Sequence, residues 1–162
     1  LSRKIAAEIT KYAAEYQAGV IVFEYLEMQG KISGKKKQKL HLWRKRDIQK
    51  LCEHQAHRNR IRVSRVSARN TSRLACDGSG AVVRNPENHS LCIFQTGKQY
   101  NCDLSATYNI GARYFIRELL KPLPETERSS LEAKVPVVKR RTSCVYADLR
   151  KLYVEVNNLK AA

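Results

Sequence analysis

The chain has 162 residues, 43% of them hydrophobic, and a formal net charge of +16. This length suits one domain with a real apolar core and, at most, a small inserted module. No apolar run approaches the ~18 residues of a membrane-spanning helix, and the first residues lack a signal-peptide layout. We therefore expect a cytoplasmic protein (nucleoid-associated in a prokaryote) that does not bind a membrane.

Most of the positive charge lies in one stretch. Between Lys31 and Arg73, fifteen Lys or Arg residues occur against two acids, Asp47 and Glu53, so that stretch carries +13. Such a one-sided excess is typical of a protein with a polyanion partner, because each neutralised phosphate releases counterions. The alternative is a solvated basic face with no dedicated partner.

The N-terminal third is predicted to begin with a helix and a strand. The helix ends at Gly19, and its inner stripe is predicted from helical spacing to be Ile5, Ile9, Tyr12 and Tyr16. A short apolar strand follows from Val20 to Leu26. Residues 29–37 have the composition of a flexible basic loop.

A long basic helix and a second strand come next. The helix is predicted over residues 38–59, with an inner stripe of Leu40, Trp43, Ile48 and Leu51. From Arg60 to Val66 apolar and polar residues alternate, as they do in a half-buried strand. Its inward-facing residues are predicted to be Ile61, Val63 and Val66.

Residues 70–102 change character and predict a small β-ribbon. Turn-forming residues occur at 77–80, 85–88 and 96–98. The short runs between these turns are predicted to be strands; they cover residues 81–84, 90–94 and 99–102.

The C-terminal part is predicted to contain two helices joined by a polar link. The first helix runs from about Ser105 to Leu120 and ends before Pro122 and Pro124. The link carries a basic patch, Lys139 to Arg141, and the last helix lies near residues 145–159. We expect its apolar stripe to pack within the same domain, with a dimer seam as the alternative; the stripe is Val145, Leu149, Leu152, Val156 and Leu159.

Two carboxylates are candidate metal ligands. Glu24 closes an apolar strand, where a buried carboxylate is costly unless it meets a metal or a cation. The alternative is an edge-strand Glu that faces water or pairs with Lys. Asp103 opens a helix, where an N-cap role is common and does not exclude metal binding.

The cysteines and histidines include a candidate zinc site. Cys76, His89, Cys92 and Cys102 include one His-x-x-Cys pair, but no Cys-x-x-Cys occurs, and structural zinc sites usually have two close pairs. Zinc is therefore not expected, and the five cysteines are interpreted as buried free thiols in a reducing compartment. His41, His54 and His57 are interpreted as surface residues.

A polar segment, Asn70-Thr-Ser-Arg73, follows the second strand. It could contact a phosphate, with Arg73 as the charged group. A simple turn with a surface Arg is the alternative.

Taken together, these motifs resemble the C-terminal portion of the transposon-encoded TnpB nucleases and the related type V CRISPR effector nucleases. The matching residues are the strand Val20-Ile-Val-Phe-Glu24-Tyr-Leu26, the segment Asn70-Thr-Ser-Arg73 before a β-ribbon, and Asp103-Leu-Ser-Ala-Thr-Tyr-Asn-Ile110. The last of these is similar to the family's Asp-x-Asn-Ala-Ala-x-Asn-Ile signature. Order and spacing agree from about residue 18 to residue 120.

The resemblance implies an α/β fold of the RNase H-like (RuvC) type, truncated at its N-terminus, with a small inserted β-ribbon. It implies three carboxylates that hold two magnesium ions, and Glu24 and Asp103 take the positions of the second and third. The implied parts are residues 1–69 and 103–121 (RuvC-like), 70–102 (a degenerate zinc-ribbon-like insert that binds target nucleic acid) and 122–162 (C-terminal tail and helix).

The implied function is the C-terminal catalytic half of an RNA-guided, metal-dependent DNA endonuclease, with a DNA target and a guide RNA as partners. Glu24, Asp103 and Arg73 are the candidate catalytic residues. The candidate nucleic-acid contacts are Lys35, Lys36, Lys37, Arg44, Lys45, Arg46, Arg58, Arg69 and Asn70.

The sequence departs from this family in two places. None of its four aspartates lies on a strand before Glu24, so a partner chain or another segment would supply the first acid. The ribbon has lost the paired cysteines, since Ile93 and Thr96 occupy two of their positions. The alternatives are a non-cleaving nucleic-acid-binding accessory subunit and a basic structural protein of a ribonucleoprotein.

Overall fold

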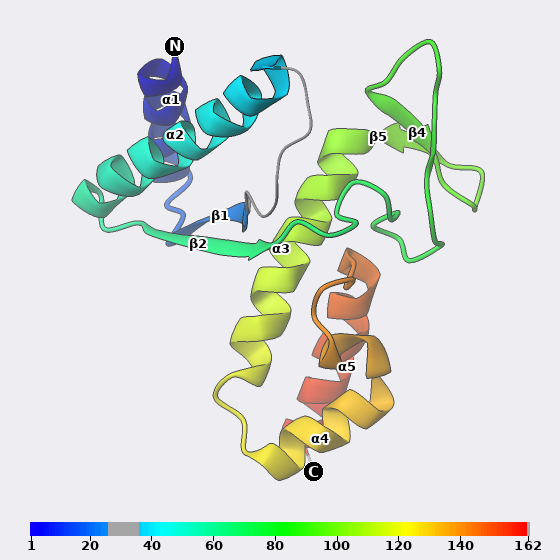
Figure 1. The fold of residues 1–162 in the computed structure, drawn as a ribbon. Coiled ribbons are helices and arrows are strands. Elements are labelled where there is room, and N and C mark those ends of the chain that lie inside the picture. The colour runs from blue at the N-terminus through cyan, green and yellow to red at the C-terminus, as the bar shows by residue number, and fades with distance from the viewer. Residues whose placement is uncertain (26–35, 162) are drawn as a thin grey trace. The chain divides into compact units, whose positions relative to one another are not determined.

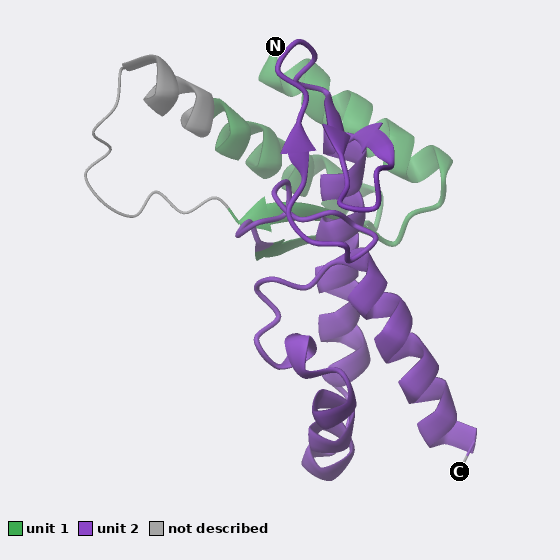
Figure 2. Cartoon of the chain, turned by 90° about the vertical axis from the view of Figure 1, so that its right-hand side faces the viewer, with its two compact units in different colours: residues 1–66 green, residues 67–162 purple. Residues whose placement is uncertain are grey.

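The computed structural model describes residues 1–25 and 36–161, and side chains within 1–25 and 44–161. The protein is of the mixed α/β class. Its chain divides into two compact units, Leu1–Val66 and Ser67–Ala162, which Figure 2 colours separately. Each unit is described by itself.

The first unit is a helix followed by a strand–helix–strand element (Figure 1). Helix α1 (Ser2–Glu15) precedes strand β1 (Val20–Tyr25), helix α2 (Lys36–Arg58) and strand β2 (Arg62–Ser67). The two strands pair in parallel. Parallel neighbours need a crossover connection, and α2 supplies it. The predicted strands and basic helix are thus confirmed to within a few residues, and the predicted loop lies largely outside the described residues.

The packed face of α1 differs from the prediction. Tyr12 and Tyr16 are 62% and 69% exposed, and their rings stack on each other with centroids 4.5 Å apart. The buried residues of α1 are the small ones, Ala6, Thr10 and Ala13. Small side chains allow α2 to approach closely, which outweighs the larger apolar area that the tyrosines would offer.

The packed face of α2 is also shifted from the prediction. Ile48 and Leu51 are only half-buried, whereas Gln49, Cys52 and Ala56 are buried. The thiol of Cys52 donates to the carbonyl oxygen of Ala6 across 3.8 Å. Of the predicted stripe, the side chains of Leu40 and Trp43 lie outside the described residues.

The second unit begins with the β-ribbon. Strands β3 (Val83–Arg84), β4 (Leu91–Ile93) and β5 (Gln99–Asn101) are antiparallel in that order, and Cys92 lies opposite Tyr100. The connection between β4 and β5 turns at Gly97, whose φ of +82° suits a residue without a side chain. The predicted ribbon is confirmed, with shorter strands.

Three helices and a 3₁₀ turn complete the second unit. They are α3 (Cys102–Leu120), α4 (Glu125–Lys134), the 3₁₀ turn (Pro136–Lys139) and α5 (Tyr146–Ala161). Helix α4 falls in the predicted polar link, so that prediction was wrong. Its residues are mostly good helix formers, and Leu131 alone among them is buried. One apolar residue gives no visible periodicity.

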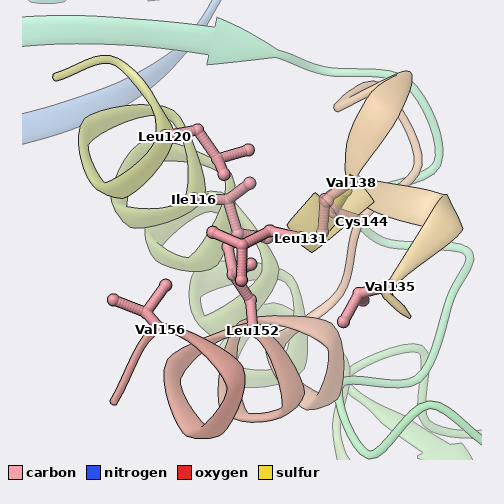
Figure 3. Close-up of a cluster of buried hydrophobic side chains, with 8 residues drawn as sticks. All are labelled: Ile116, Leu120, Leu131, Val135, Val138, Cys144, Leu152 and Val156. Atoms are coloured by element: carbon pink, nitrogen blue, oxygen red, sulfur yellow. The ribbon is translucent and has the colours of Figure 1, made fainter. Parts of the chain in front are cut away.

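The main core lies between α3, α4 and α5 (Figure 3). Ile116 and Leu120 of α3 pack with Leu131 of α4 and with Leu152 and Val156 of α5. Leu149, Leu152 and Val156 of the predicted α5 stripe therefore pack within their own unit, as expected. Leu152 and Val156 are at most 3% exposed and so are not available for a dimer seam. Within the described ranges, no helix combines the length and the apolar composition needed to cross a membrane.

Candidate functional site

Glu24 lies near the end of β1 and is half-buried, like the four strand residues before it. Its backbone carbonyl accepts a hydrogen bond from Nε2 of Gln49 at 3.0 Å. Gln49 is buried, and its Oε1 accepts from Nε of Arg65 at 3.3 Å. This pair of bonds ties the end of β1 to α2 and to β2. Because Glu24 is only partly covered, its charge does not carry the full cost of burial.

A positively charged hollow of about 300 Å³ adjoins the end of β1. Its lining consists of Tyr25, Arg46, Gln49, Lys50 and Arg65. Nη2 of Arg65 also contacts Oε2 of Glu53 at 2.8 Å, and this hydrogen bond lowers the pKa of Glu53. Three cationic side chains around one hollow favour an anionic ligand such as a phosphate.

The other candidate nucleic-acid contacts have different degrees of exposure. On α2, Arg44, Lys45 and Arg58 are exposed and Arg46 is half-buried. After β2, Arg69 is exposed and Asn70 is half-buried. Lys36 and Lys37 belong to the first turn of α2, but their side chains, like the whole of Lys35, lie outside the described residues.

Asp103 is the second residue of α3, and it does not cap that helix. The N-cap is Asn101, whose Oδ1 accepts from the backbone N–H of Leu104 at 2.9 Å. The N-cap alternative for Asp103 is therefore excluded, because the helix begins earlier than expected. The carboxylate of Asp103 is exposed, and no group among the described residues donates to it. The positive end of the helix dipole stabilises its charge.

The segment Asn70–Arg73 forms a tight turn. Asn70 has a φ of +60°, and its carbonyl accepts from the backbone N–H groups of Arg73 and Leu74 at 3.2 and 3.1 Å. Thr71 is buried and its hydroxyl donates to the carbonyl of Ala68. Arg73 is exposed. The turn interpretation is confirmed, and the guanidinium remains accessible to a ligand.

Three polar side chains on one face of α3 bond to this turn and to the backbone on either side of it. We call Ser105, Asn109 and Arg113 the α3 clamp. The Ser105 hydroxyl accepts from the backbone N–H of Cys76 at 3.1 Å. Nδ2 of Asn109 donates to the carbonyls of Thr71 and Leu74 at 3.0 and 2.8 Å.

The α3 clamp also reaches the start of α5. Oδ1 of Asn109 accepts from the backbone N–H of Tyr146 at 3.1 Å. Nη1 of Arg113 donates to the carbonyl of Ser67 at 2.6 Å, and its Nε donates to the carbonyl of Cys144 at 3.0 Å. All three clamp residues are at most 3% exposed. The helix that carries Asp103 is thus fixed to the turn that carries Arg73.

The clamp was not recognised from the sequence, although it left a signal. Its members recur every four residues, so they line one face of α3. That face is buried, and a buried polar stripe needs hydrogen-bond partners. Here the partners are backbone groups in two segments, residues 67–76 and 144–146, which lie 29 to 46 positions away along the chain.

The ribbon thiols pack as apolar groups. Cys76, Cys92 and Cys102 are buried in one cluster with Ala75 and Phe94. Burial, followed by the neighbouring Cys102, raises the pKa of the Cys92 thiol. A metal ligand must be a thiolate, so this environment favours packing over ligation. All five cysteines are buried free thiols, as expected. Of the histidines interpreted as surface residues, His54 and His57 are exposed, and the side chain of His41 lies outside the described residues.

Within residues 1–25 and 44–161, no three His, Cys, Asp or Glu side chains gather in a way that could hold a metal ion. Comparison with known proteins found no matching family model, no matching curated protein and no matching solved structure. Function must therefore be argued from the residues themselves.

Proposed function

We propose that the chain is the C-terminal catalytic part of a metal-dependent DNA endonuclease guided by RNA, with a RuvC-type site on an RNase H-like fold. The observation that carries this proposal is the α3 clamp. Its hydrogen bonds fix the helix that carries an exposed carboxylate, Asp103, to the turn that carries an exposed guanidinium, Arg73. Phosphodiester cleavage requires such fixed charged groups around the phosphate.

Glu24 and Asp103 are the proposed magnesium ligands. Their carboxylate oxygens are the hard donors that magnesium prefers, and the ion keeps several waters when few protein ligands are present. The exposure of Asp103 and the partial exposure of Glu24 are consistent with this role. When bound, the metal would lower the pKa of the attacking water and offset charge on the leaving oxygen. Arg73 would neutralise a neighbouring phosphate oxygen.

Nucleic acid is the proposed substrate because of charge. The first unit has sixteen Lys or Arg residues and six Asp or Glu residues, a net charge of +10 over its 66 residues. Arg46, Lys50 and Arg65 line the hollow beside the end of β1. These groups would hold the phosphate backbone near the strand that carries Glu24.

The proposal is tested by an assay for cleavage of single-stranded DNA by the full chain in magnesium. The assay is run with and without a separately produced segment that carries a strand aspartate. Asp103→Asn and Glu24→Gln each remove a proposed ligand, so we expect a roughly thousandfold loss of cleavage. Glu87→Gln, at an exposed turn, is the matched control and should cut normally. Cleavage that survives both ligand substitutions would contradict the proposal.

The second candidate is a nucleic-acid-binding accessory subunit that does not cut. It is favoured by the lack of a three-ligand cluster among the described residues. Under this reading DNA is bound but stays intact even when the supplementary segment is added, and Asp103→Asn changes nothing. The same assay therefore separates the two candidates.

A further inference from the structure

The second unit contains a hollow whose lining is unusually rich in aromatic rings. It has a volume of about 340 Å³, within the range of small-ligand sites. Tyr100 comes from β5, Tyr108 from α3 and Tyr146 from α5. We call this the aromatic hollow; its remaining lining residues are Cys76, Asp77, Phe94, Lys98, Ala147 and Arg150.

Two rings of the aromatic hollow are presented to solvent, whereas Phe94 is buried and Tyr100 is half-buried. Tyr108 and Tyr146 are 42% and 37% exposed, with centroids 5.2 Å apart and planes tilted by 50°. A tilted pair leaves part of each face open, which a flat ligand can cover. Because the α3 clamp bonds the backbone of Tyr146 to Asn109, the helix that carries one ring is fixed against the helix that carries the other.

Two cations complete the lining. Nζ of Lys98 lies 4.6 Å from the centroid of the Tyr100 ring, and Arg150 lies on α5. The single acid, Asp77, is engaged locally: its Oδ1 accepts from the backbone N–H of Ser79 and its Oδ2 from the hydroxyl of Thr96. Asp77 keeps its charge, so Lys98 and Arg150 give the lining a net charge of +1. The unit is also positive, with fifteen Lys or Arg against nine Asp or Glu.

A second, more apolar groove adjoins the aromatic hollow and shares Tyr146 and Arg150 with it. Its volume is about 460 Å³, and it adds two exposed rings, Phe115 and Tyr153. The aromatic surface thus continues along α3 and α5 with a cation, Arg150, at the junction.

We infer that the aromatic hollow and its adjoining groove bind single-stranded nucleic acid, with unpaired bases stacked on Tyr108, Tyr146 and Tyr153 and phosphates held by Lys98 and Arg150. Aromatic faces interleaved with cations are the arrangement that binds single strands without reading their sequence. An aliphatic docking surface for a protein helix would not need the two cations. This inference goes beyond the proposed cleavage chemistry and does not depend on a metal.

The test measures binding of a fluorescent oligothymidylate of about a dozen nucleotides to the full chain in EDTA, where no cleavage occurs. Tyr108→Leu keeps apolar bulk but removes a stacking face, so binding should weaken roughly tenfold. Tyr12→Leu is the matched control, because Tyr12 is also exposed and stacked on a second tyrosine, but outside the hollow. That variant should bind like the parent.

An abasic strand of the same length provides a test that needs no variant. It keeps every phosphate and loses every base, so stacking predicts roughly tenfold or greater weakening. Equal affinity for the abasic and thymidine strands would overturn the inference, as would equal effects of Tyr108→Leu and Tyr12→Leu. Failure here leaves the magnesium-dependent cleavage assay unaffected, so the two proposals can fail separately.

Discussion

The two units hold themselves together in different ways. The first unit carries the higher charge and has a small buried cluster of Ala13, Ala56 and Ile61. The second has a cluster of larger aliphatic side chains from three helices, and the α3 clamp beside it. The difference suggests a division of roles: the first unit supplies charge, and the second supplies a stiff frame. Substitutions of exposed cations in the first unit should therefore affect mainly the salt dependence of binding, and substitutions of core or clamp residues in the second unit should affect mainly stability.

The largest expected effect is at Asn109. Asn109→Ala removes the partner of the buried carbonyl of Thr71 and the partners of the part-buried carbonyl of Leu74 and N–H of Tyr146. Each unsatisfied buried group costs ~1–3 kcal/mol, so the free energy of unfolding should fall by about 4 kcal/mol. Urea denaturation measures this free energy of unfolding. Asn157→Ala, at an exposed position of α5, is the matched control. A fall below ~1 kcal/mol would mean that the clamp does not form.

A direct comparison of the two cores comes next. Leu152 is fully buried in the second unit, and Leu152→Ala should lower the free energy of unfolding by about 3 kcal/mol. Ile21 is half-buried against the small cluster of the first unit, and Ile21→Ala should cost about 1 kcal/mol. Thermal or urea denaturation gives both values. Equal losses would remove the contrast between the units.

Alkaline pH should lower the free energy of unfolding because of the buried thiols. Burial raises the pKa of Cys144 from 9.0 to about 11, so the folded state holds this proton more tightly than the unfolded chain. Its contribution to stability is complete below pH 9.0 and is lost as the pH rises to about 11. We expect a fall of about 2 kcal/mol in the free energy of unfolding over that interval.

Variants show which thiol causes the fall in the free energy of unfolding at alkaline pH. Cys144→Ala should remove the part of the fall that this thiol contributes, and a further part should remain because the pKa of Cys92 is also raised to about 11. Cys52→Ala, in the first unit, should remove less, because a hydrogen bond with Thr10 offsets part of the effect of burial on the pKa of Cys52. The slope of stability against pH, measured by urea denaturation, gives the result. An unchanged slope in Cys144→Ala would contradict the assignment.

The smallest effect on stability is expected on the exposed face of α2. Arg44→Gln and Lys45→Gln should each leave the free energy of unfolding within ~0.5 kcal/mol of the parent. Each should also reduce the slope of log affinity against log salt concentration by about one, because each removes one phosphate contact. Anisotropy titrations at several salt concentrations measure this slope. A slope unchanged in both variants would exclude these residues from the interface.

Local signals predicted much of the fold. The strands β1 and β2, the basic helix and the ribbon follow from alternation, composition and turn residues such as Gly97, all of which act over a few residues. Helix α4 was missed because Leu131 is its one buried residue. The packed face of α1 was predicted wrongly because Ala6 and Ala13 pack through small size, which hydrophobic periodicity does not weigh.

The site was only partly predictable. Glu24, Arg73 and Asp103 could be selected by residue type and position, and the structure finds them half-buried, exposed and exposed, respectively. The clamp that supports Arg73 and Asp103 was not foreseen. Side chains such as Asn109 bond to backbone groups far away in the chain, and those partners become defined only when the fold is known.

The central claim is that Glu24 and Asp103 are both metal ligands. Paramagnetic line broadening by Mn²⁺ in place of Mg²⁺ tests this claim most directly. If Glu24 and Asp103 are both metal ligands, substoichiometric Mn²⁺ should broaden the amide resonances around both residues, and Asp103→Asn should abolish the broadening at both positions. The Glu87→Gln control should retain it. Broadening that is absent from both positions, or confined to one of them, would contradict the account.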